Sequence, residues 1–266
     1  MKPSGIITLT TDFGTSDIYV GVMKGVILSI APQARIVDLT HDIAPQDIAG
    51  AGFALAAAFS YFPAGTVHVA VVDPGVGTER RAIIIETYSH FFVGPDNGLF
   101  SFVLRGRDVQ QVVEITNKEY VLPVRSATFH GRDIFAPAAA YISKGVPAAR
   151  FGPVVNDPVM MSATEPVVVD RETMRGEIIH IDRFGNLITN IHREMLERFT
   201  AGRVFSLNVR KKKIMRLLKN YAAAKENEVF SIIGSTGLLE ISINGKSAAE
   251  RLRARVGDSV TLQVAE

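Results

Sequence analysis

Apolar and polar residues alternate along the first half of the chain in a pattern of short strands and longer helices. Apolar and β-branched runs predict strands over residues 6–10, 36–39, 67–72, 83–86 and 91–93. Helical spacing predicts helices over residues 19–30, 49–59, 99–104 and 135–144. The run Val67–Val72 is apolar almost throughout, as expected for a parallel strand covered on both faces. The alternation predicts an α/β layered domain with a mostly parallel sheet over residues 1–155.

The pattern changes after a stretch rich in turn residues. Pro158 and Pro166, together with Asn156 and Asp157, mark residues 156–166 as a linker. Beyond it, short strands are predicted over residues 167–169, 176–181, 203–209, 229–233, 238–243 and 259–264. Short strands separated by turn signals predict a smaller all-β domain, a barrel or a sandwich, over residues 167–266.

Composition narrows the available chemistry. The 266 residues contain no cysteine, which excludes disulfides, thiolate metal sites, iron–sulfur clusters and cysteine nucleophiles. The sequence has 29 Lys and Arg residues and 27 Asp and Glu residues, so its net charge is only +2. Because so small a charge does not attract a polyanion, no nucleic-acid partner is expected. The basic run Arg210–Lys213 is interpreted as an exposed loop between two strands, since no aromatic residue is interleaved with it.

Membrane and export signals are not apparent in the sequence. The longest apolar stretch, residues 49–62, falls short of the ~20 apolar residues that span a bilayer. The amino terminus lacks the long apolar core and small-residue cleavage site of a secretory signal. We therefore expect a cytoplasmic protein with no membrane partner.

The first polar loop follows the first predicted strand and reads Thr11-Asp12-Phe13-Gly14-Thr15-Ser16-Asp17. An Asp at the end of the first strand of an α/β sheet is well placed to accept hydrogen bonds from ribose hydroxyls, and this is the interpretation favoured for Asp12. The two carboxylates of the loop are also suited to a divalent cation, because hard cations prefer oxygen ligands. For Asp17 we favour a structural role as the N-cap of the following helix.

The loop after the third strand carries Asp73, Gly75, Gly77 and Arg80. Its glycines do not match the dinucleotide-binding fingerprint, and it has no lysine of the phosphate-loop kind. What remains is a carboxylate and two guanidiniums on a tight turn, which a purely structural Asp–Arg pair would also explain.

Two further segments carry residues suited to binding or catalysis. His130 lies beside a glycine just before a predicted helix and is a candidate acid or base near neutral pH, although a loop histidine bonded to a backbone carbonyl is the simpler alternative. In the second domain, Phe184 offers an aromatic face for a base, and Asn186 offers an amide for a purine edge. A β-turn alone would also account for the Gly185-Asn186 pair.

Taken together, four motifs resemble one family. They are Thr11-Asp12-Phe13-Gly14, Val72-Asp73-Pro74-Gly75-Val76-Gly77, Phe129-His130-Gly131-Arg132-Asp133 and Asp182-Arg183-Phe184-Gly185-Asn186. The set resembles the S-adenosyl-L-methionine hydroxide adenosyltransferases, relatives of the fluorinase and chlorinase enzymes, across essentially the whole chain. The resemblance implies an α/β domain followed by a β-barrel, no cofactor and no bound metal. It also implies a homotrimer whose active sites lie between the first domain of one subunit and the second domain of its neighbour.

The resemblance assigns roles to residues of both domains. It implies a catalytic triad of Asp73, Arg80 and His130, and a ribose-binding carboxylate at Asp12. The implied methionine contacts are Asp182 for the amino group, with Ser235 and Thr236 for the carboxylate. The implied adenine contacts are Phe184 and Tyr221 for the faces, Asn186 for the edge, and the backbone near Asn244 and Gly245. Halogenating relatives carry an arginine where this chain has Thr236.

The residues beside the reacting carbon favour water over halide as the nucleophile. The halogenating relatives place a Tyr at the position of Asp73, whereas here Asp73 and His130 make the pocket charged and polar. A halide must be stripped of water and would be repelled by a neighbouring carboxylate. The implied reaction is in-line attack of water on C5′ of S-adenosyl-L-methionine, which yields adenosine and L-methionine. Arg80 would stabilise the nucleophile, and either Asp73 or His130 would receive its proton.

Other functions remain open at this stage. One is a metal-dependent nucleoside hydrolase or phosphoesterase that uses Asp12, Asp17, Asp42 and Asp47 as ligands. A second is a protein that binds S-adenosyl-L-methionine or adenosine without turnover. A halogenase-like substitution is the third.

Overall fold

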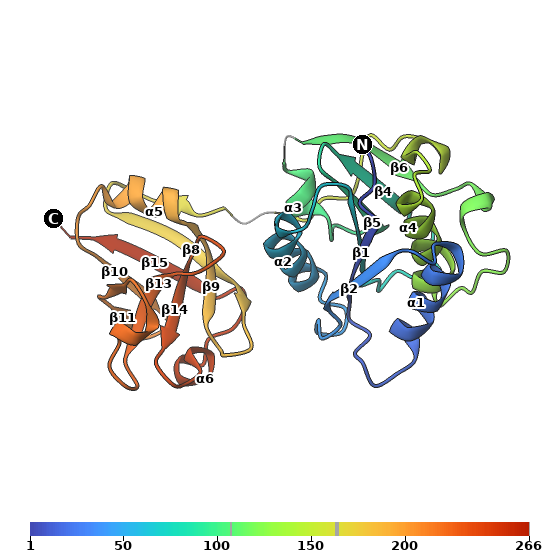
Figure 1. Cartoon of the computed structure of the whole chain (residues 1–266). Coiled ribbons are helices and arrows are strands. Elements are labelled where there is room, and N and C mark those ends of the chain that lie inside the picture. Colours follow the sequence, from blue (N-terminus) through green and yellow to red (C-terminus); the bar gives the residue numbers. More distant parts are fainter. Residues whose placement is uncertain (107, 163–164, 266) are drawn as a thin grey trace. The chain divides into compact units, whose positions relative to one another are not determined.

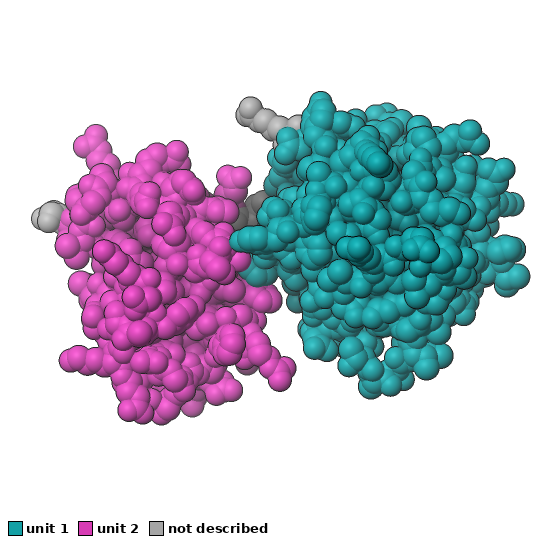
Figure 2. All heavy atoms as spheres, viewed as in Figure 1, with its two compact units in different colours: residues 1–161 teal, residues 162–266 magenta. Residues whose placement is uncertain are grey.

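The computed structural model describes residues 1–106, 108–162 and 165–265. The chain divides into two compact units, Met1–Met161 (unit 1) and Ser162–Glu266 (unit 2), coloured separately in Figure 2. The division falls inside the predicted linker at 156–166, of which residues 163–164 lie outside the described residues. No helix in the described part of the chain has the length and apolar character needed to cross a membrane.

A six-stranded sheet forms the centre of unit 1, in the order β2-β1-β3-β5-β4-β6. The strands are β1 (Ile6–Thr11), β2 (Arg35–Thr40), β3 (Thr66–Val71), β4 (Ala82–Thr87), β5 (His90–Pro95) and β6 (Val109–Glu114). The pairs β1–β2, β1–β3 and β3–β5 are parallel, whereas β4 runs antiparallel to both β5 and β6. The predicted mostly parallel sheet is therefore mixed. Only two residues connect β4 to β5, and so short a connection joins antiparallel strands only.

Helices cover both faces of this sheet (Figure 1). Helices α1 (Tyr19–Ile30) and α4 (Ala136–Ser143) pack against each other and share a core with Ile7, Leu9 and Val69 of the strands. Helices α2 (Ile48–Ala58) and α3 (Ser101–Leu104) lie on the other face, in a second core that includes Ala70, Ile83 and Phe92. Because side chains alternate across a strand, both cores draw on β3, which explains its continuous apolar run.

Side-chain capping differs between the first two helices. Asp47 caps α2, since its Oδ1 accepts a hydrogen bond from the Gly50 N–H at 2.9 Å. The predicted N-cap role of Asp17 is wrong: the N-cap of α1 is Ile18, which makes no side-chain cap bond, and Asp17 is exposed. The helix begins at Tyr19, so Asp17 lies one residue before the N-cap position.

Unit 2 contains a nine-stranded sheet with the main order β11-β10-β15-β8-β9-β14-β13-β12, and β7 pairs with β8. The strands are β7 (Val167–Val168), β8 (Thr173–Ile181), β9 (Leu187–His192), β10 (Phe205–Val209), β11 (Lys212–Ile214), β12 (Leu217–Leu218), β13 (Val229–Ile233), β14 (Leu238–Ile243) and β15 (Ser259–Val264). The sheet curls around one apolar core that includes Met174, Ile178 and Leu207. In the described residues no strand ladder joins β11 to β12, so the sheet is a curled half-barrel, which confirms the predicted β-barrel in part.

Two helices make unit 2 less purely β than predicted. They are α5 (Arg193–Thr200) and α6 (Ala248–Leu252). Leu196 of α5 and Ala248 of α6 enter the apolar core, which gives each helix a buried side. The basic run Arg210–Lys213, expected to be a loop, contains the start of β11 at Lys212. Single 3₁₀ turns complete the chain at Phe59–Tyr61, Lys118–Tyr120, Ala148–Arg150 and Tyr221–Ala223.

A buried histidine pair lies inside unit 1. His68 of β3 contacts Thr8 Oγ1 through Nδ1 at 2.8 Å and His90 Nδ1 through Nε2 at 3.3 Å. The rings of Phe59 and Phe92 surround it. Burial and the nearby charge of His90 lower the pKa of His68 to about 3. The folded protein therefore holds His68 neutral.

The buried pair predicts that unit 1 loses stability in mild acid. In the unfolded chain His68 has its ordinary pKa of 6.5 and binds a proton below that pH, whereas in the folded protein it binds one only near pH 3. The free energy of unfolding therefore falls as the pH falls below 6.5. Because of His68 alone, the free energy of unfolding is expected to fall by about 2 kcal/mol between pH 7 and pH 5. Urea unfolding at pH 7 and pH 5 measures this change. In His68→Asn the free energy of unfolding is expected to change between the two pH values by about 2 kcal/mol less than in the wild type, whatever the absolute stability of the variant. His192→Asn, which alters an exposed histidine, is the control; equal pH dependence in the two variants would contradict the assignment.

Candidate active site

A cavity of about 440 Å³ opens in unit 1 at the carboxyl ends of β1 and β3. The residues that line it come from four separate segments of the chain: Asp12, Phe13 and Tyr19; Pro45 and Gln46; Val71, Asp73, Pro74 and Val76; and Thr128, Phe129, His130 and Gly131. This is the edge at which α/β sheets bind ligands, because the connecting loops converge there.

Asp12 forms one side of the cavity. It is half-buried, and its Oδ2 accepts a hydrogen bond from the Gln46 N–H at 2.9 Å. This contact fixes the carboxylate between the loop after β1 and the loop after β2. A carboxylate oxygen has further acceptor capacity, so Asp12 is placed to receive hydroxyl donors from a ligand in the cavity.

Asp73, Arg80 and His130 form a continuous polar cluster, of which Asp73 and His130 line the cavity. Arg80 Nε donates to both carboxylate oxygens of Asp73 at 3.0 Å, and Arg80 Nη2 also contacts Asp73 Oδ2. The same Nη2 lies 2.7 Å from His130 Nδ1. The side chains of Asp73 and Arg80 are only 6% and 10% exposed. The Arg80 guanidinium also stacks over the Phe135 ring at 5.2 Å, so it is held on several sides.

The contact with Arg80 determines the protonation of His130. A guanidinium only donates hydrogen bonds, so His130 Nδ1 must accept, and its proton resides on Nε2. Burial lowers the pKa of His130 and the positive charge of Arg80 lowers it further, while Asp73 offsets part of the effect. Near neutral pH the ring is therefore an uncharged Nε2–H donor.

Close backbone packing brings the two loops of the cluster together. Gly77, on the loop with Asp73, has a φ of +78°, and a Cβ there would lie 2.3 Å from the Ala127 carbonyl oxygen. Asn97 Nδ2 donates to the Val72 carbonyl at 2.8 Å, which supports the loop where it leaves β3. Glycine at position 77 therefore allows the loop that carries Arg80 to approach the segment that leads to His130.

A π-helix over Gly131–Phe135 follows His130, where the sequence predicted a helix only from residue 135. Asp133 of this turn is fully buried; its Oδ1 accepts from Arg132 Nε at 2.6 Å, and its Oδ2 accepts from the Ser126 N–H at 2.7 Å. Burial alone would raise the pKa of Asp133, but these hydrogen bonds outweigh it and lower the pKa. Asp133 holds the segment before His130 in place. Asp133 belongs to one of the four motifs, but the sequence alone indicated no role for it.

In unit 2, the predicted contacts at Asp182, Phe184 and Asn186 share one tight turn. Asp182 Oδ1 accepts from the backbone N–H groups of Phe184 and Asn186, each at 2.9 Å. Its Oδ2 accepts from Asn186 Nδ2 at 2.8 Å, which uses one of the amide donors predicted for a purine edge. Phe184 is 77% exposed at the tip of the turn. The predicted loop ends at this turn, because β9 begins at Leu187.

The remaining predicted contacts of unit 2 lie around β13 and β14. Ser235 and Thr236 are exposed in the turn between these strands, and Asn244 follows β14 with its Nδ2 donating to the Ala224 carbonyl at 2.9 Å. Gly245, which comes next, has a φ of +79°. Tyr221 Oη donates to Glu240 Oε2 at 3.1 Å. Glu240 was missed by sequence reasoning, although an acidic residue inside the apolar run Leu238–Ile243 was a visible signal.

The carboxylates of the metal-ion alternative are not gathered into a site. In residues 1–106, 108–162 and 165–265 no group of three or more His, Asp or Glu side chains is arranged to hold a metal ion. Of the four carboxylates proposed for it, Asp47 caps α2 and Asp12 accepts from Gln46.

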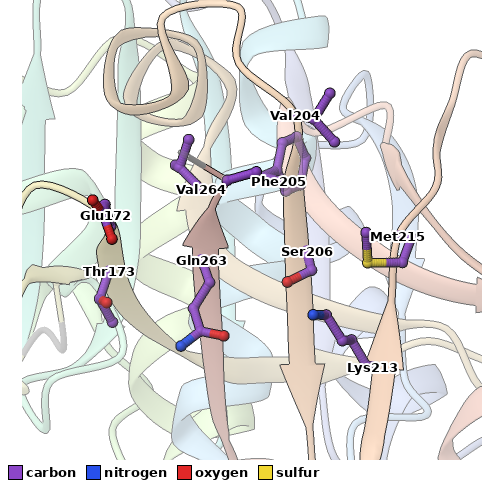
Figure 3. A pocket seen from close by; sticks show the side chains of 10 residues that line it. Glu172, Thr173, Val204, Phe205, Ser206, Lys213, Met215, Gln263 and Val264 are labelled. Carbon is purple, nitrogen blue, oxygen red and sulfur yellow. The ribbon is translucent and has the colours of Figure 1, made fainter.

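A second hollow, of about 220 Å³, lies in unit 2 beside β10, β11 and β15. Figure 3 shows its lining, which includes Glu172, Ser206, Lys213, Met215 and Gln263. It contains none of the predicted site residues.

Comparisons with known proteins agree with this division of the chain. The model of the SAM hydroxide adenosyltransferase N-terminal domain matches residues 7–152, and that of the C-terminal domain matches residues 176–261. The chain is 37% identical to an (R)-S-adenosyl-L-methionine hydrolase of Salinispora tropica, with 97% of each chain covered. It is 38% identical to a hydrolase of the same name from Methanocaldococcus jannaschii, with 97% of this chain and 95% of the relative covered.

Among solved structures, an uncharacterized conserved protein from Thermotoga maritima matches with a TM-score of 0.91 and 36% identity, over 97% of this chain and 99% of the other. Halogenating enzymes are more distant. A fluorinase of Actinoplanes sp. is 27% identical over 97% of each chain.

Proposed function

Because the chain belongs to the SAM hydroxide adenosyltransferase family, we propose that it hydrolyses S-adenosyl-L-methionine to adenosine and L-methionine. The observation that carries the proposal is the cluster of Asp73, Arg80 and His130, in which Asp73 and His130 line the unit 1 cavity and Arg80 bonds to both. A carboxylate and a neutral imidazole are hydrogen-bond partners for water. The same carboxylate would repel a halide, which argues against a halogenase.

The reaction requires one bond to form and one to break. The oxygen of water attacks C5′ in line with the sulfonium, the C5′–S bond breaks, and its electron pair returns to sulfur. Methionine leaves as a neutral thioether, so no acid is needed to assist departure. Catalysis therefore depends on positioning the water and removing its proton.

The bonding of the cluster favours Asp73 as the proton acceptor. His130 presents Nε2–H, because its Nδ1 lone pair is directed to Arg80, so it donates to the water oxygen and orients it. Asp73 keeps acceptor capacity beyond the hydrogen bonds from Arg80. Bulk water has a pKa of about 15.7, which one arginine does not bring near neutrality. The proton therefore leaves during attack, when the oxygen has become strongly acidic and a carboxylate suffices as base.

Substrate binding is assigned to both units. Asp12 receives the ribose hydroxyls in the cavity. Asp182 binds the methionine amino group, and Ser235 and Thr236 bind its carboxylate. The adenine contacts are Phe184, Tyr221, Asn186, Asn244 and Gly245. The homotrimer stays a prediction.

Isotope labelling tests the proposed reaction. Purified protein incubated with S-adenosyl-L-methionine in ¹⁸O-water is expected to release adenosine labelled at its 5′ oxygen, equally with and without EDTA and with halide present. Mass spectrometry of the nucleoside gives the answer. Adenine, a 5′-halogenated nucleoside, loss of activity with EDTA, or unchanged substrate would each contradict the proposal.

Variants separate catalysis from binding. Arg80→Lys keeps the positive charge but loses the paired contacts with Asp73 and His130, so kcat is expected to fall by about 10²-fold or more while the substrate Kd changes little. Asp12→Ala is expected to weaken binding instead. Arg35→Lys and Asp42→Ala, at exposed positions of unit 1, are matched controls. Loss of substrate binding in Arg80→Lys would contradict its catalytic assignment.

The pH profile tests the state of His130. The competent ring is neutral, and its pKa is lowered by burial and by Arg80, so kcat is expected to stay constant near neutrality and fall only at a pH below 6.5. His130→Asn keeps an acceptor for Arg80 but does not titrate, so its remaining activity should lose this acid limb. An unchanged limb in that variant would assign it to another group.

A further inference from the structure

Unit 2 contains a buried carboxylate that the proposed function does not use. Glu240 lies in the middle of β14, between β13 and β9, and is 6% exposed. Its neighbours Leu239 and Ile241 belong to the apolar core on one face of the strand. Glu240 and Ser242 therefore share the opposite face, where charge is costly unless a partner compensates it.

The partners available to Glu240 are few. Its Oε2 accepts from Tyr221 Oη at 3.1 Å, the one hydrogen bond that the described residues give its carboxylate. The other oxygen lies against Gly234, where a Cβ would come within 1.6 Å of it. Glycine at position 234 therefore leaves the space that this oxygen occupies. A carboxylate accepts about four hydrogen bonds, so Glu240 retains capacity for further donors.

The charge around this carboxylate is unbalanced. No Lys or Arg within the described ranges forms a salt bridge with Glu240 or Asp182. Burial raises the pKa of Glu240 and the negative charge of Asp182 raises it further, while the bond from Tyr221 offsets part of this effect. Burial and the charge of Glu240 likewise raise the pKa of Tyr221 to about 12. A cation between the two carboxylates would relieve their repulsion.

A second observation points to a ligand at the same place. The Ser242 hydroxyl is fully buried and makes no hydrogen bond of normal distance and angle among the described residues. It makes only a weak contact with the hydroxyl of Tyr221, which lowers the pKa of that group. Buried hydroxyls are normally paired, so this weakly bonded hydroxyl beside an undersupplied carboxylate has capacity for a polar ligand.

We infer that Glu240 is the second carboxylate of a subsite, shared with Asp182, for the ammonium group of the amino-acid part of the substrate. The inference rests on the proposed function, which supplies a substrate with such a group. An ammonium has three N–H donors and carries the positive charge that the subsite lacks. Asp182 already uses its oxygens within its own turn, and Glu240 supplies an acceptor that is less committed. Tyr221 holds the Glu240 carboxylate in position.

Binding of two ligands that differ only in the amino group tests the inference. Calorimetry would compare L-methionine with 4-(methylthio)butanoate for the wild type and for Glu240→Gln, which keeps the shape and removes the charge. Loss of a hydrogen bond to a charged group is expected to weaken L-methionine binding about tenfold or more. Binding of the analogue should change less than about twofold, since no charged donor is lost. Equal effects on both ligands, or no effect on either, would overturn the inference.

Further variants exclude a purely structural role. Tyr221→Phe removes the hydroxyl but keeps both carboxylates, so it is expected to weaken L-methionine binding less than Glu240→Gln does. If Glu240 acts only by orienting Tyr221, the two variants will instead behave alike and will also weaken adenosine binding. Glu240→Asp keeps the charge and should retain most of the preference for L-methionine over the analogue. Loss of that preference in a folded Glu240→Asp protein would also count against the subsite. Glu226→Gln, at an exposed position, is the matched control.

Binding and turnover separate this inference from the proposed function. If the wild type binds L-methionine with the expected dependence on Glu240 but does not hydrolyse S-adenosyl-L-methionine, the subsite stands and the proposed function fails. If hydrolysis occurs and Glu240→Gln leaves both L-methionine binding and the KM of S-adenosyl-L-methionine unchanged, the proposed function stands and the subsite is wrong.

Discussion

The guanidinium of Arg80 organises the polar cluster of unit 1. It binds Asp73 through two nitrogens, directs the lone pair of His130 Nδ1 toward itself, and stacks over Phe135. One group thereby pairs with a carboxylate and sets the tautomer of an imidazole. The surrounding structure supports this arrangement: glycine at position 77 lets the two loops meet, and buried Asp133 anchors the segment before His130. Positioning of this kind is what an attack by water on a sulfonium-bound carbon requires.

The two units treat charge in different ways. In unit 1 the carboxylate of Asp73 is already paired with Arg80, so the cluster is complete without a ligand. In unit 2 Asp182 and Glu240 have no cationic partner in the described residues, and the proposed substrate carries two positive groups, a sulfonium and an ammonium. A pre-paired site keeps its geometry through the reaction, whereas an unpaired one derives binding energy from the ligand that completes it.

The sheet of unit 1 explains why the cluster lies where it does. Parallel strands β1 and β3 are neighbours and end at the same edge, so Asp12 and Asp73, which follow them, line one cavity. The antiparallel β4–β5 hairpin does not disturb this edge, since β4 lies beyond β5. His68 and His90 lie nearer the beginnings of β3 and β5, away from the cavity edge, and burial keeps His68 neutral there.

Much of the architecture was determined by the sequence itself. Local periodicity predicted α1, β13, β14 and β15 with the bounds observed, because alternation of apolar residues reports which side of an element is covered. The four motifs together indicated the family, and the absence of cysteine left carboxylate, His and Arg as the chemistry. Helix α5 was missed because its weakly apolar sequence contributes only one side to the core, and Asp17 was misassigned because capping depends on backbone angles.

Only the tertiary structure decided how distant residues act on one another. Arg80 and His130 are 50 positions apart, and the tautomer of the histidine follows from their contact alone. Glu240 sits in a run of strand residues whose local pattern gives no sign that Tyr221 and Gly234 enclose it. Strand order and direction in unit 1 likewise depend on pairings between segments far apart in the chain. The physical reason is the same in each case: a local pattern specifies that a side chain will be covered, whereas the group that covers it, and therefore its charge state, comes from elsewhere in the fold.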